Sequence, residues 1–410
     1  MPRVLLLIPS DSYRALDFLQ AARHVGVQAV VGTDQPPAYD PADQGHLLAL
    51  PFHDPAAATA RIEEFHRTWP LDAVVAVDDA GTQLAARASA ALALRSSPEE
   101  AVVAASNKLV FREVLAATGL PGPTFQAVPV SMAAAAAARA APYPCVLKPL
   151  FLNASRGVIR ADSPAEFEEA FSRIKAILAD AEVAARGGAL AETVLVESYL
   201  RGAEAALEGT VIGGELRVLA VLDKPEPLEG PFFQETMFVT PSRHDMALQT
   251  EMARQGQAAV AALGLLDGPV HAEFRIDGNQ VRLLELAPRS IGGNCARLLR
   301  FGTGETLEVV ILRQALGIPM GGTARESRAA GVMMIPIPRR GVLRAVTGLG
   351  AAKRVPGIEG VDITLKRGQE AVPPPEGHQY LGFIYARAES PLAVEQALRA
   401  AHAALRIELD

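Results

Sequence analysis

The chain has 410 residues, a formal net charge of −7 and 50% hydrophobic residues, so we expect an ordinary globular protein of two or three domains. The negative net charge argues against a nucleic-acid surface, and no apolar run has the length of a membrane span. Its two cysteines, Cys145 and Cys295, lie in segments expected to be buried, which indicates free thiols in a reducing compartment and a cytoplasmic protein.

Residues 1–104 alternate between strand-like and helix-like segments. The segment 13–26 has helical spacing of its apolar residues. Short apolar runs have the composition of parallel strands buried on both faces: RVLLLIP (3–9), QAVVGTD (28–34) and LDAVVAVDD (71–79). This series predicts an open parallel α/β domain. Asp78 and Asp79 end the last run, and the sequence leaves open whether they face a ligand at the carboxyl edge of the sheet or begin the next helix.

Residues 105–320 are expected to form a second, strand-rich domain. Two short helices and a turn within 97–125 place the boundary near residue 105. The strand-like runs that follow are PCVLKPL (144–150), RGVIRA (156–161), TVLVESYL (193–200) and the segment 205–224. From residue 321 onward, further strand-like runs and a closing helix over 390–405 predict an α+β domain covering 321–410.

The segment HAEFRIDGNQVRLLELAPRSIGG (271–293) reads as a β-hairpin with two acids in apolar surroundings. If Ile276 pairs with Gln280 across a three-residue loop, Glu273 and Glu285 lie on one face as diagonal neighbours. A two-residue loop would place them on opposite faces, so the prediction depends on register. Two such acids suit Mg²⁺ or Mn²⁺, and the alternative is a pair of solvated acids on an exposed face.

Two lysines and a loop precede this hairpin. Lys148 lies inside an apolar strand, where a buried ammonium needs a partner. Directly after it, FLNASRGV (151–158) is a loop of small residues whose backbone N–H groups can surround a phosphate. Lys108, in SNKLVFREVL, is by itself an ordinary surface residue.

Taken in this order, these features resemble the ATP-grasp superfamily over about residues 105 to 320. The features are Asn107-Lys108, the Lys148 strand with its loop, LVESYLRGAE (195–204), the paired glutamates and Arg289. The resemblance implies an ATP-grasp fold with an N-terminal α/β domain, a central ATP-binding region of two subdomains and a C-terminal α+β domain.

The resemblance also implies ATP as cofactor and a set of nucleotide contacts. The phosphates would meet Lys108, Lys148 and the loop; adenine would meet Glu197 and the chain that follows it; the ribose hydroxyls would meet Glu204. By position, the implied contacts are Lys108, Lys148, Asn153, Ser155, Arg156, Gly157, Glu197, Tyr199, Leu200 and Glu204.

Magnesium or manganese ions would be held by Glu273 and Glu285, and Arg289 would stabilise the anionic reacting centre together with backbone N–H groups near Gly292 and Gly293. Two positions depart from the family pattern. Ala287 stands where many members have an asparagine ligand, which puts the number of metal ions in doubt. Asn153-Ala154 stands where glycines are usual in the phosphate loop, so positive φ is harder to reach there.

The stretch LDKPEPLEGPFFQETMFVTPS (222–242) and ELAPRSIGG look most like the L-amino acid ligase and carnosine synthase branch. That branch joins a carboxylate to an amine, and its pattern would place Lys224, Glu235 and His271 near these small-molecule substrates. Each of the three also has an ordinary structural interpretation. The alternatives are a biotin-carboxylase-like or purine-biosynthesis ligase, or a nucleotide-binding protein without turnover. The sequence leaves the substrates open, and also the oligomeric state, although homodimers are common in such families.

Overall fold

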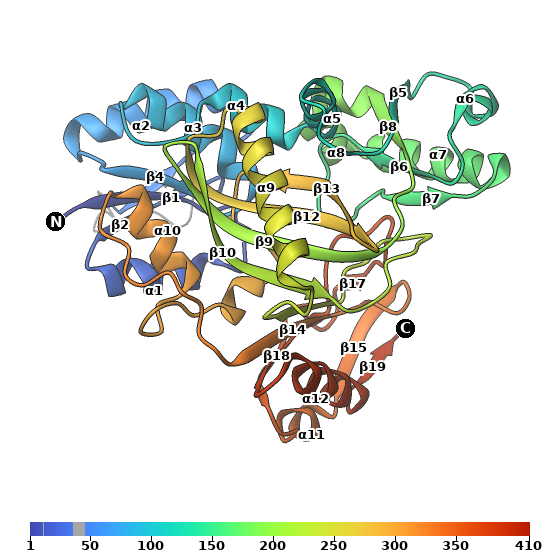
Figure 1. Cartoon of the computed structure of the whole chain (residues 1–410). Coiled ribbons are helices and arrows are strands. Elements are labelled where there is room, and N and C mark those ends of the chain that lie inside the picture. Colours follow the sequence, from blue (N-terminus) through green and yellow to red (C-terminus); the bar gives the residue numbers. More distant parts are fainter. Residues whose placement is uncertain (11, 36–45) are drawn as a thin grey trace.

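The computed structural model describes residues 1–10, 12–35 and 46–410, and begins with a parallel sheet (Figure 1). Its strands, in the spatial order β3-β2-β1-β4, are β1 (Arg3–Leu7), β2 (Gln28–Thr33), β3 (Leu47–Ala49) and β4 (Ala73–Ala76). The helices that alternate with them are α1 (Ala15–Val25), α2 (Pro55–Thr68) and α3 (Thr82–Ala91). All three strand pairs are parallel, which confirms the predicted open α/β domain.

Strand β1 shows why this sheet forms. Val4 and Leu6 belong to one buried cluster, while Leu5 and Leu7 belong to another. Successive side chains of a strand point to opposite faces, so a continuous apolar run is what a sheet covered on both sides requires. Helix α1 ends at Gly26, which adopts a left-handed conformation with φ of 73° and lets the chain turn into β2.

The central region holds a small antiparallel sheet with helices around it. Its strands, in the order β5-β8-β6-β7, are β5 (Phe125–Pro129), β6 (Cys145–Pro149), β7 (Ile159–Ala161) and β8 (Thr193–Ser198). The accompanying helices are α4 (Glu99–Ser106), α5 (Lys108–Ala117), α6 (Ala134–Ala140), α7 (Pro164–Leu178) and α8 (Ala181–Gly187). The two expected helices within 97–125 and the pairing of 144–150 with 156–161 are confirmed.

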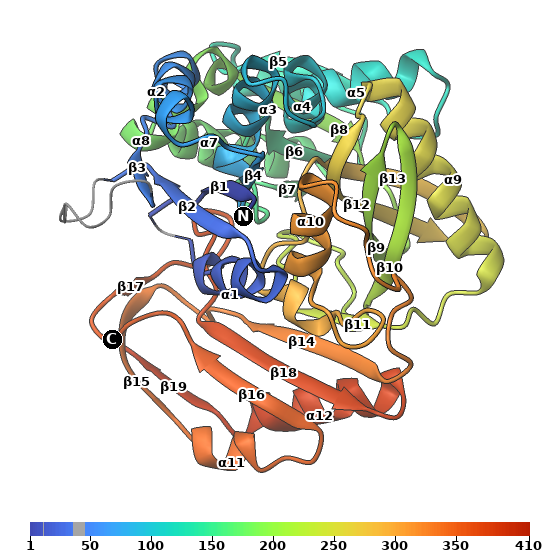
Figure 2. The same ribbon diagram turned by 90° about the vertical axis from the view of Figure 1, so that its left-hand side faces the viewer.

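A long antiparallel sheet joins the central region to the C-terminal residues (Figure 2). Its order is β13-β12-β9-β10-β11-β14-β18-β16. The strands are β9 (Ala203–Ile212), β10 (Glu215–Lys224), β11 (Met237–Thr240), β12 (Asp267–Asp277), β13 (Gln280–Ala287), β14 (Ala329–Ile335), β16 (Ile358–Ile363) and β18 (Gly382–Ala388). Helices α9 (Met246–Leu263) and α10 (Leu307–Ala315) pack against its central strands.

The remaining C-terminal elements comprise a three-stranded sheet in the order β17-β15-β19 and two helices, which lie at the lower end of the molecule in Figure 1. They are β15 (Gly341–Thr347), α11 (Leu349–Lys353), β17 (Glu370–Ala371), α12 (Pro391–Ala403) and β19 (Arg406–Leu409). Helix α12 packs on β14 and β18, as expected of an α+β unit. Within the described parts of the chain, no helix combines the length and the apolar character needed to cross a membrane.

The predicted hairpin of 271–293 is present, but its expected loop length is wrong. Asp277 pairs with Gln280, so only Gly278 and Asn279 form the turn. A β-bulge between Glu273 and Phe274 then shifts the register, and Glu273 lies directly opposite Glu285. An extra residue in one strand of an antiparallel pair has this effect. The two acids therefore share a face despite the shorter turn, and they are closer partners than the expected diagonal arrangement.

The turn into β9 gives a test of the fold. Gly202 has φ of 108°, and a Cβ added there would lie 2.1 Å from the carbonyl oxygen of Ile276. We predict that Gly202→Ala lowers the free energy of unfolding by roughly 2–4 kcal/mol, because backbone atoms cannot move aside easily. Gly278→Ala is the matched control, since Gly278 also has positive φ but open space around its Cβ position. Chemical denaturation of both variants measures the difference, and equal losses would contradict the steric argument.

Candidate functional site

The centre of the site is the pair of carboxylates on β12 and β13. Glu273 and Glu285 are directly opposite in the sheet register. The Nζ of Lys108 lies 3.5 Å from Oε1 of Glu285 and donates to the carbonyl oxygen of Leu152 at 3.0 Å. Lys108 is the first residue of α5, and Asn107 caps that helix by accepting from two backbone N–H groups. One lysine thus connects the hairpin, the helix and the small-residue loop.

A buried lysine occupies the acidic cluster beside this pair. The Nζ of Lys224 lies 3.1 Å from Glu204 and 3.1 Å from Glu273, and it also contacts Glu235. Burial alone would raise the pKa of Glu273, but the positive charge of Lys224 outweighs it and holds that pKa well below its usual range. Burial raises the pKa of Glu235 to about 7. Glu204 is also paired with Arg275 at 2.7 Å, so the acid expected to meet the ribose is fully engaged by cations.

These acids have the composition of a site for a divalent cation. Ligand oxygens of Glu204, Glu235 and Glu273 lie within 4.8 Å of one another, and Glu285 faces Glu273 across the strand pair. Hard oxygen donors suit Mg²⁺ and Mn²⁺, and a ligand must be ionised, as Glu273 is. Ala287 pairs with His271 in the sheet and brings no oxygen ligand from its side chain. The residues present fit a cation held between Glu273 and Glu285.

His271 holds one of the two acids in place. Its Nε2 lies 3.2 Å from Glu273, and its Nδ1 lies 3.1 Å from Glu208, a carboxylate that is fully buried. Burial would lower the pKa of His271, but hydrogen bonds to Glu208 and Glu273 raise it to about 9. The imidazole is therefore a charged link between two carboxylates. Glu208 also accepts from the backbone N–H of Ile291 at 3.1 Å, which ties this chain of bonds to the segment after β13.

Lys148 has the partner that its burial requires. Its Nζ lies 2.6 Å from a carboxylate oxygen of Glu197. The other oxygen of Glu197 lies 2.6 Å from Nε of Arg112. Burial alone would raise the pKa of Glu197, but Arg112 and Lys148 lower it to about 2. The carboxylate expected to meet adenine is thus committed to two cations. Tyr199 and Leu200 follow it at the end of β8, where the N–H of Tyr199 donates to the carbonyl oxygen of Pro144 at 2.8 Å.

In the loop 151–158, two residues that are not glycines adopt a left-handed backbone. Ala154 and Ser155 have φ of 51° and 56°. A left-handed backbone costs a residue with a side chain roughly 1 kcal/mol, so neighbouring contacts must hold this shape. The N–H of Arg156 donates to the carbonyl oxygen of Asn153 at 3.1 Å, while its Nε is buried without a hydrogen-bond partner among the described residues.

The same loop docks on the C-terminal part of the chain. The N–H of Gly157, which has φ of 73°, donates to the carbonyl oxygen of Pro375 at 2.8 Å. Arg173, on α7, makes a bidentate pair with Glu376 at 2.9 and 3.0 Å, and its guanidinium lies over the ring of Phe232. The small sheet and the C-terminal unit are therefore bonded to each other across the loop.

Arg289 and the glycines after it contact the N-terminal domain. The Nε of Arg289 lies 2.7 Å from Asp79. The N–H of Gly293 donates to the hydroxyl of Tyr13 at 2.9 Å, and the carbonyl oxygen of Gly292 accepts from a backbone N–H at 3.0 Å. The amide of Gly293, expected to face the reacting centre, is thus engaged by Tyr13. The sequence left open whether the acids after β4 face a ligand or begin the next helix. Asp79 forms an ion pair, and the side chain of Asp78 makes no capping hydrogen bond to the helix that follows.

Several residues that shape the site were not identified from the sequence. Arg112, Glu208 and Arg14 are buried ions whose partners lie far along the chain. Arg112 offered one usable indication, because it interrupts the apolar face of an amphipathic helix. No periodicity or spacing indicates the other two.

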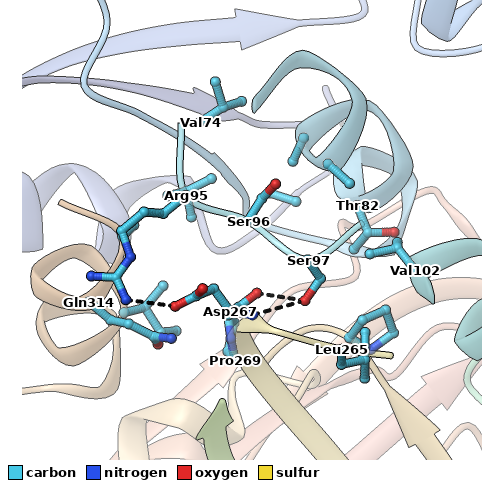
Figure 3. Close-up of a pocket in the computed structure, with 18 of the residues that line it drawn as sticks. Val74, Thr82, Arg95, Ser96, Ser97, Val102, Leu265, Asp267, Pro269 and Gln314 are labelled. Carbon is cyan, nitrogen blue, oxygen red and sulfur yellow. Dashed lines mark hydrogen bonds and ion pairs between the residues drawn. The ribbon is translucent and has the colours of Figure 1, made fainter. Parts of the chain in front are cut away.

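A cavity of about 90 Å³ lies elsewhere, between the N-terminal domain and the first residues of β12 (Figure 3). Arg95 pairs with Asp267 at 2.8 Å across its mouth, and the Ser97 hydroxyl donates to the carbonyl oxygen of Asp267 at 2.8 Å (Figure 3). None of the site residues lines this cavity. The ion pair of Arg95 with Asp267 therefore joins the N-terminal domain to β12 beside this cavity.

Three families match successive parts of the chain. The ATP-grasp N-terminal domain matches residues 19–94, and the ATP-grasp domain matches residues 141–297. L-amino acid ligase C-terminal domain 2 matches residues 333–410. Together they cover the N-terminal, central and C-terminal parts of the fold in that order.

Individual relatives extend this similarity. The crystal structure of L-amino acid ligase from Bacillus licheniformis has a TM-score of 0.82 and 25% identity, covering 100% of this chain and 99% of that one. The uncharacterized protein y4rH of Sinorhizobium fredii is 22% identical over 95% of this chain and 80% of that protein. Carnosine synthase 1 of Homo sapiens is 28% identical over 37% of this chain, and the match spans 18% of that protein.

The docked loop makes a testable prediction. We expect Glu376→Gln to weaken the pair with Arg173 and to speed hydrogen exchange at the Gly157 amide about 2- to 5-fold, because the pair is partly exposed and its contribution is screened by solvent. Glu370→Gln, an exposed acid of the same C-terminal unit, is the control and should leave that amide unchanged. Exchange followed by mass spectrometry gives the comparison. Identical protection in both variants would show that Glu376 does not hold the loop.

Proposed function

Because the chain belongs to the ATP-grasp superfamily of ligases, which form C–N bonds, we propose that it uses ATP to activate a carboxylate as an acylphosphate and joins it to an amine. The product would be an amino-acid amide or a dipeptide. The observation that carries the proposal is the placement of Glu273 opposite Glu285, beside Lys108 and the loop 151–158. The match to the L-amino acid ligase C-terminal domain supports amino-acid substrates over a biotin-carboxylase-like or purine-biosynthesis reaction.

The phosphates of ATP would lie between Lys108 and the phosphate loop. Lys108 contacts both the loop carbonyl of Leu152 and Glu285, so its ammonium sits between the two parts that would hold the nucleotide. Glu273 and Glu285 would hold magnesium, which when bound neutralises phosphate charge and favours attack by an anionic carboxylate.

The reaction proceeds in two steps. A substrate carboxylate oxygen forms a bond to the γ-phosphorus of ATP, the bond to the leaving oxygen breaks, and ADP departs. The amine nitrogen then bonds to the carbonyl carbon, phosphate leaves, and the nitrogen loses a proton. The tetrahedral intermediate carries an oxyanion, and Arg289 would donate hydrogen bonds to it. Docking of the loop 151–158 would exclude water, which otherwise hydrolyses the acylphosphate.

Substrate recognition would use the edge of the acidic cluster. Glu235 is partly exposed, whereas Lys224 and His271 are buried and paired with other acids. We therefore assign Glu235 to the ammonium group of an amino-acid substrate. Lys224 and His271 would act behind it, by fixing the positions of Glu273 and its neighbours.

The direct test is an incubation of the protein with ATP, Mg²⁺ and a pool of amino acids. We expect phosphate release that depends on an amine, together with amide products detected by mass spectrometry. Omission of Mg²⁺ should abolish both. Phosphate release unaffected by any amine, with no new amide, would count against the ligase assignment and for nucleotide binding without ligation.

Glu285→Gln tests the metal ligand. The amide side chain keeps the shape but loses the charge, so we predict a loss of turnover of about 100-fold or more, with the fold intact by circular dichroism. Glu215→Gln, an exposed acid at the start of β10, should retain wild-type turnover. Retention of full activity by the Glu285 variant would remove that residue from the site.

Arg289→Met tests the stabilisation of the oxyanion. We expect amide formation to fall about 10²–10³-fold, since the methionine side chain fills similar space without donors. Nucleotide binding, measured by calorimetry with a non-hydrolysable ATP analogue, should change little. An equal loss of binding and amide formation would instead indicate that the guanidinium serves the nucleotide.

A further inference from the structure

The segment 289–293, termed here the arginine loop, is held mainly by side chains of the N-terminal domain. We propose that Tyr13, Arg14 and Asp79 are positioning residues that fix the arginine loop for amide formation. The proposal rests on the function proposed above, because it concerns where Arg289 is held during that reaction. On this proposal the N-terminal domain contributes to the reaction by positioning Arg289, a role separate from that of the acids in the hairpin.

Asp79 fixes the guanidinium itself. Its Oδ1 lies 2.7 Å from Nε of Arg289, while Nη1 of Arg289 donates to the carbonyl oxygen of Ser290 at 3.0 Å. A guanidinium is planar, so bonds from two of its nitrogens set the orientation of the whole group. The other N–H groups stay available for a substrate oxygen. Burial alone would lower the pKa of Arg289, but the charge of Asp79 raises it above its usual value, so the group stays charged.

Arg14 fixes the next residue of the loop. It is 1% exposed, and it donates to the carbonyl oxygen of Val77 at 2.9 Å and to the hydroxyl of Ser290 at 2.8 Å. Asp78 and Glu308 lie 3.9 Å from its guanidinium. Burial of a cation is costly without close partners, and an apolar side chain would pack here at lower cost. The bonds to the end of β4 and to the loop explain why a cation stands at this position.

Tyr13 and Glu208 each accept a backbone N–H from the end of the loop. The hydroxyl of Tyr13 accepts from the N–H of Gly293 at 2.9 Å. Glu208 accepts from the N–H of Ile291 at 3.1 Å and is linked through His271 to Glu273. The loop is therefore fixed to the N-terminal domain on one side and to the metal-binding strand pair on the other.

This double attachment sets the position of Arg289 relative to Glu273. A loop residue has no helix or strand hydrogen bonds to define its place, and an error of about 1 Å at a reacting centre can cost on the order of 10²-fold in rate. Binding of ATP, by contrast, uses Lys108 and the loop 151–158, which none of the three N-terminal residues touches. Loss of positioning should therefore affect amide formation and spare nucleotide affinity.

Asp79→Asn is the main experiment, because asparagine keeps an acceptor but removes the charge. We expect kcat for amide formation to fall about 10- to 100-fold, KM for ATP to stay within about twofold, and more phosphate to be released per amide formed. Asp79→Glu should recover part of the loss. Asp72→Asn, at the other end of β4, is the matched control, since Asp72 accepts only from the chain near β1 and should leave the kinetics unchanged.

A second measurement follows the loop itself. Tyr13→Phe removes one hydroxyl, and we expect faster hydrogen exchange at the Gly293 amide while the Ile291 amide, held by Glu208, stays protected. Unchanged kcat and coupling in Asp79→Asn, or unchanged exchange in Tyr13→Phe, would overturn the positioning role. If the wild-type protein forms no amide with any amine, the proposed function fails, and the exchange measurement still decides whether the N-terminal domain holds the loop.

Discussion

The site depends on one irregularity in a hairpin, the β-bulge that brings Glu285 opposite Glu273. With the two-residue turn alone, Glu273 would face Leu284, and Glu285 would point to the other side of the sheet. A bulge leaves backbone groups without a strand partner, and Arg112 supplies the missing bond by donating to the carbonyl oxygen of Leu284 at 2.6 Å. The same guanidinium binds Glu197, so the register of the acidic pair is tied to the small sheet.

Two facing carboxylates inside a protein are stable only if cations share their charge. The chain provides these cations from separate elements: Lys108 for Glu285, and Lys224 and His271 for Glu273. Burial alone would drive Glu273 towards its neutral form, but the charge of Lys224 holds the pKa of Glu273 well below its usual range. Both oxygens of Glu273 are held by these cations, Oε1 by His271 and Oε2 by Lys224, so the proposed divalent ion would have to share or displace these contacts.

The fold and the acidic pair were predictable because their signals are local, whereas the bonds that fix them are not. Alternating apolar runs indicated the parallel sheet, and the spacing of Glu273, Glu285 and Arg289 indicated the site. The predicted loop length was wrong because no sequence pattern distinguishes a β-bulge from an additional residue in the loop. The need of Lys148 for a partner could be predicted, but Glu197 could not be named. Arg14 and Ser290 are 276 positions apart, so no spacing rule connects them.

The long-range bonds have a common geometry: the outer domains each hold a loop of the central region. The N-terminal domain holds the arginine loop through Asp79, and the C-terminal unit contacts the loop 151–158 through Pro375 and the neighbouring helix α7 through Glu376. Neither loop has regular secondary structure to define its shape, and Ala154 and Ser155 adopt a backbone that their side chains disfavour. The central region alone would keep the acidic pair, since the hairpin and Arg112 belong to it. It would lose the contacts that hold the guanidinium and the loop 151–158 near that pair, so we expect the proposed reaction to require all three parts of the chain.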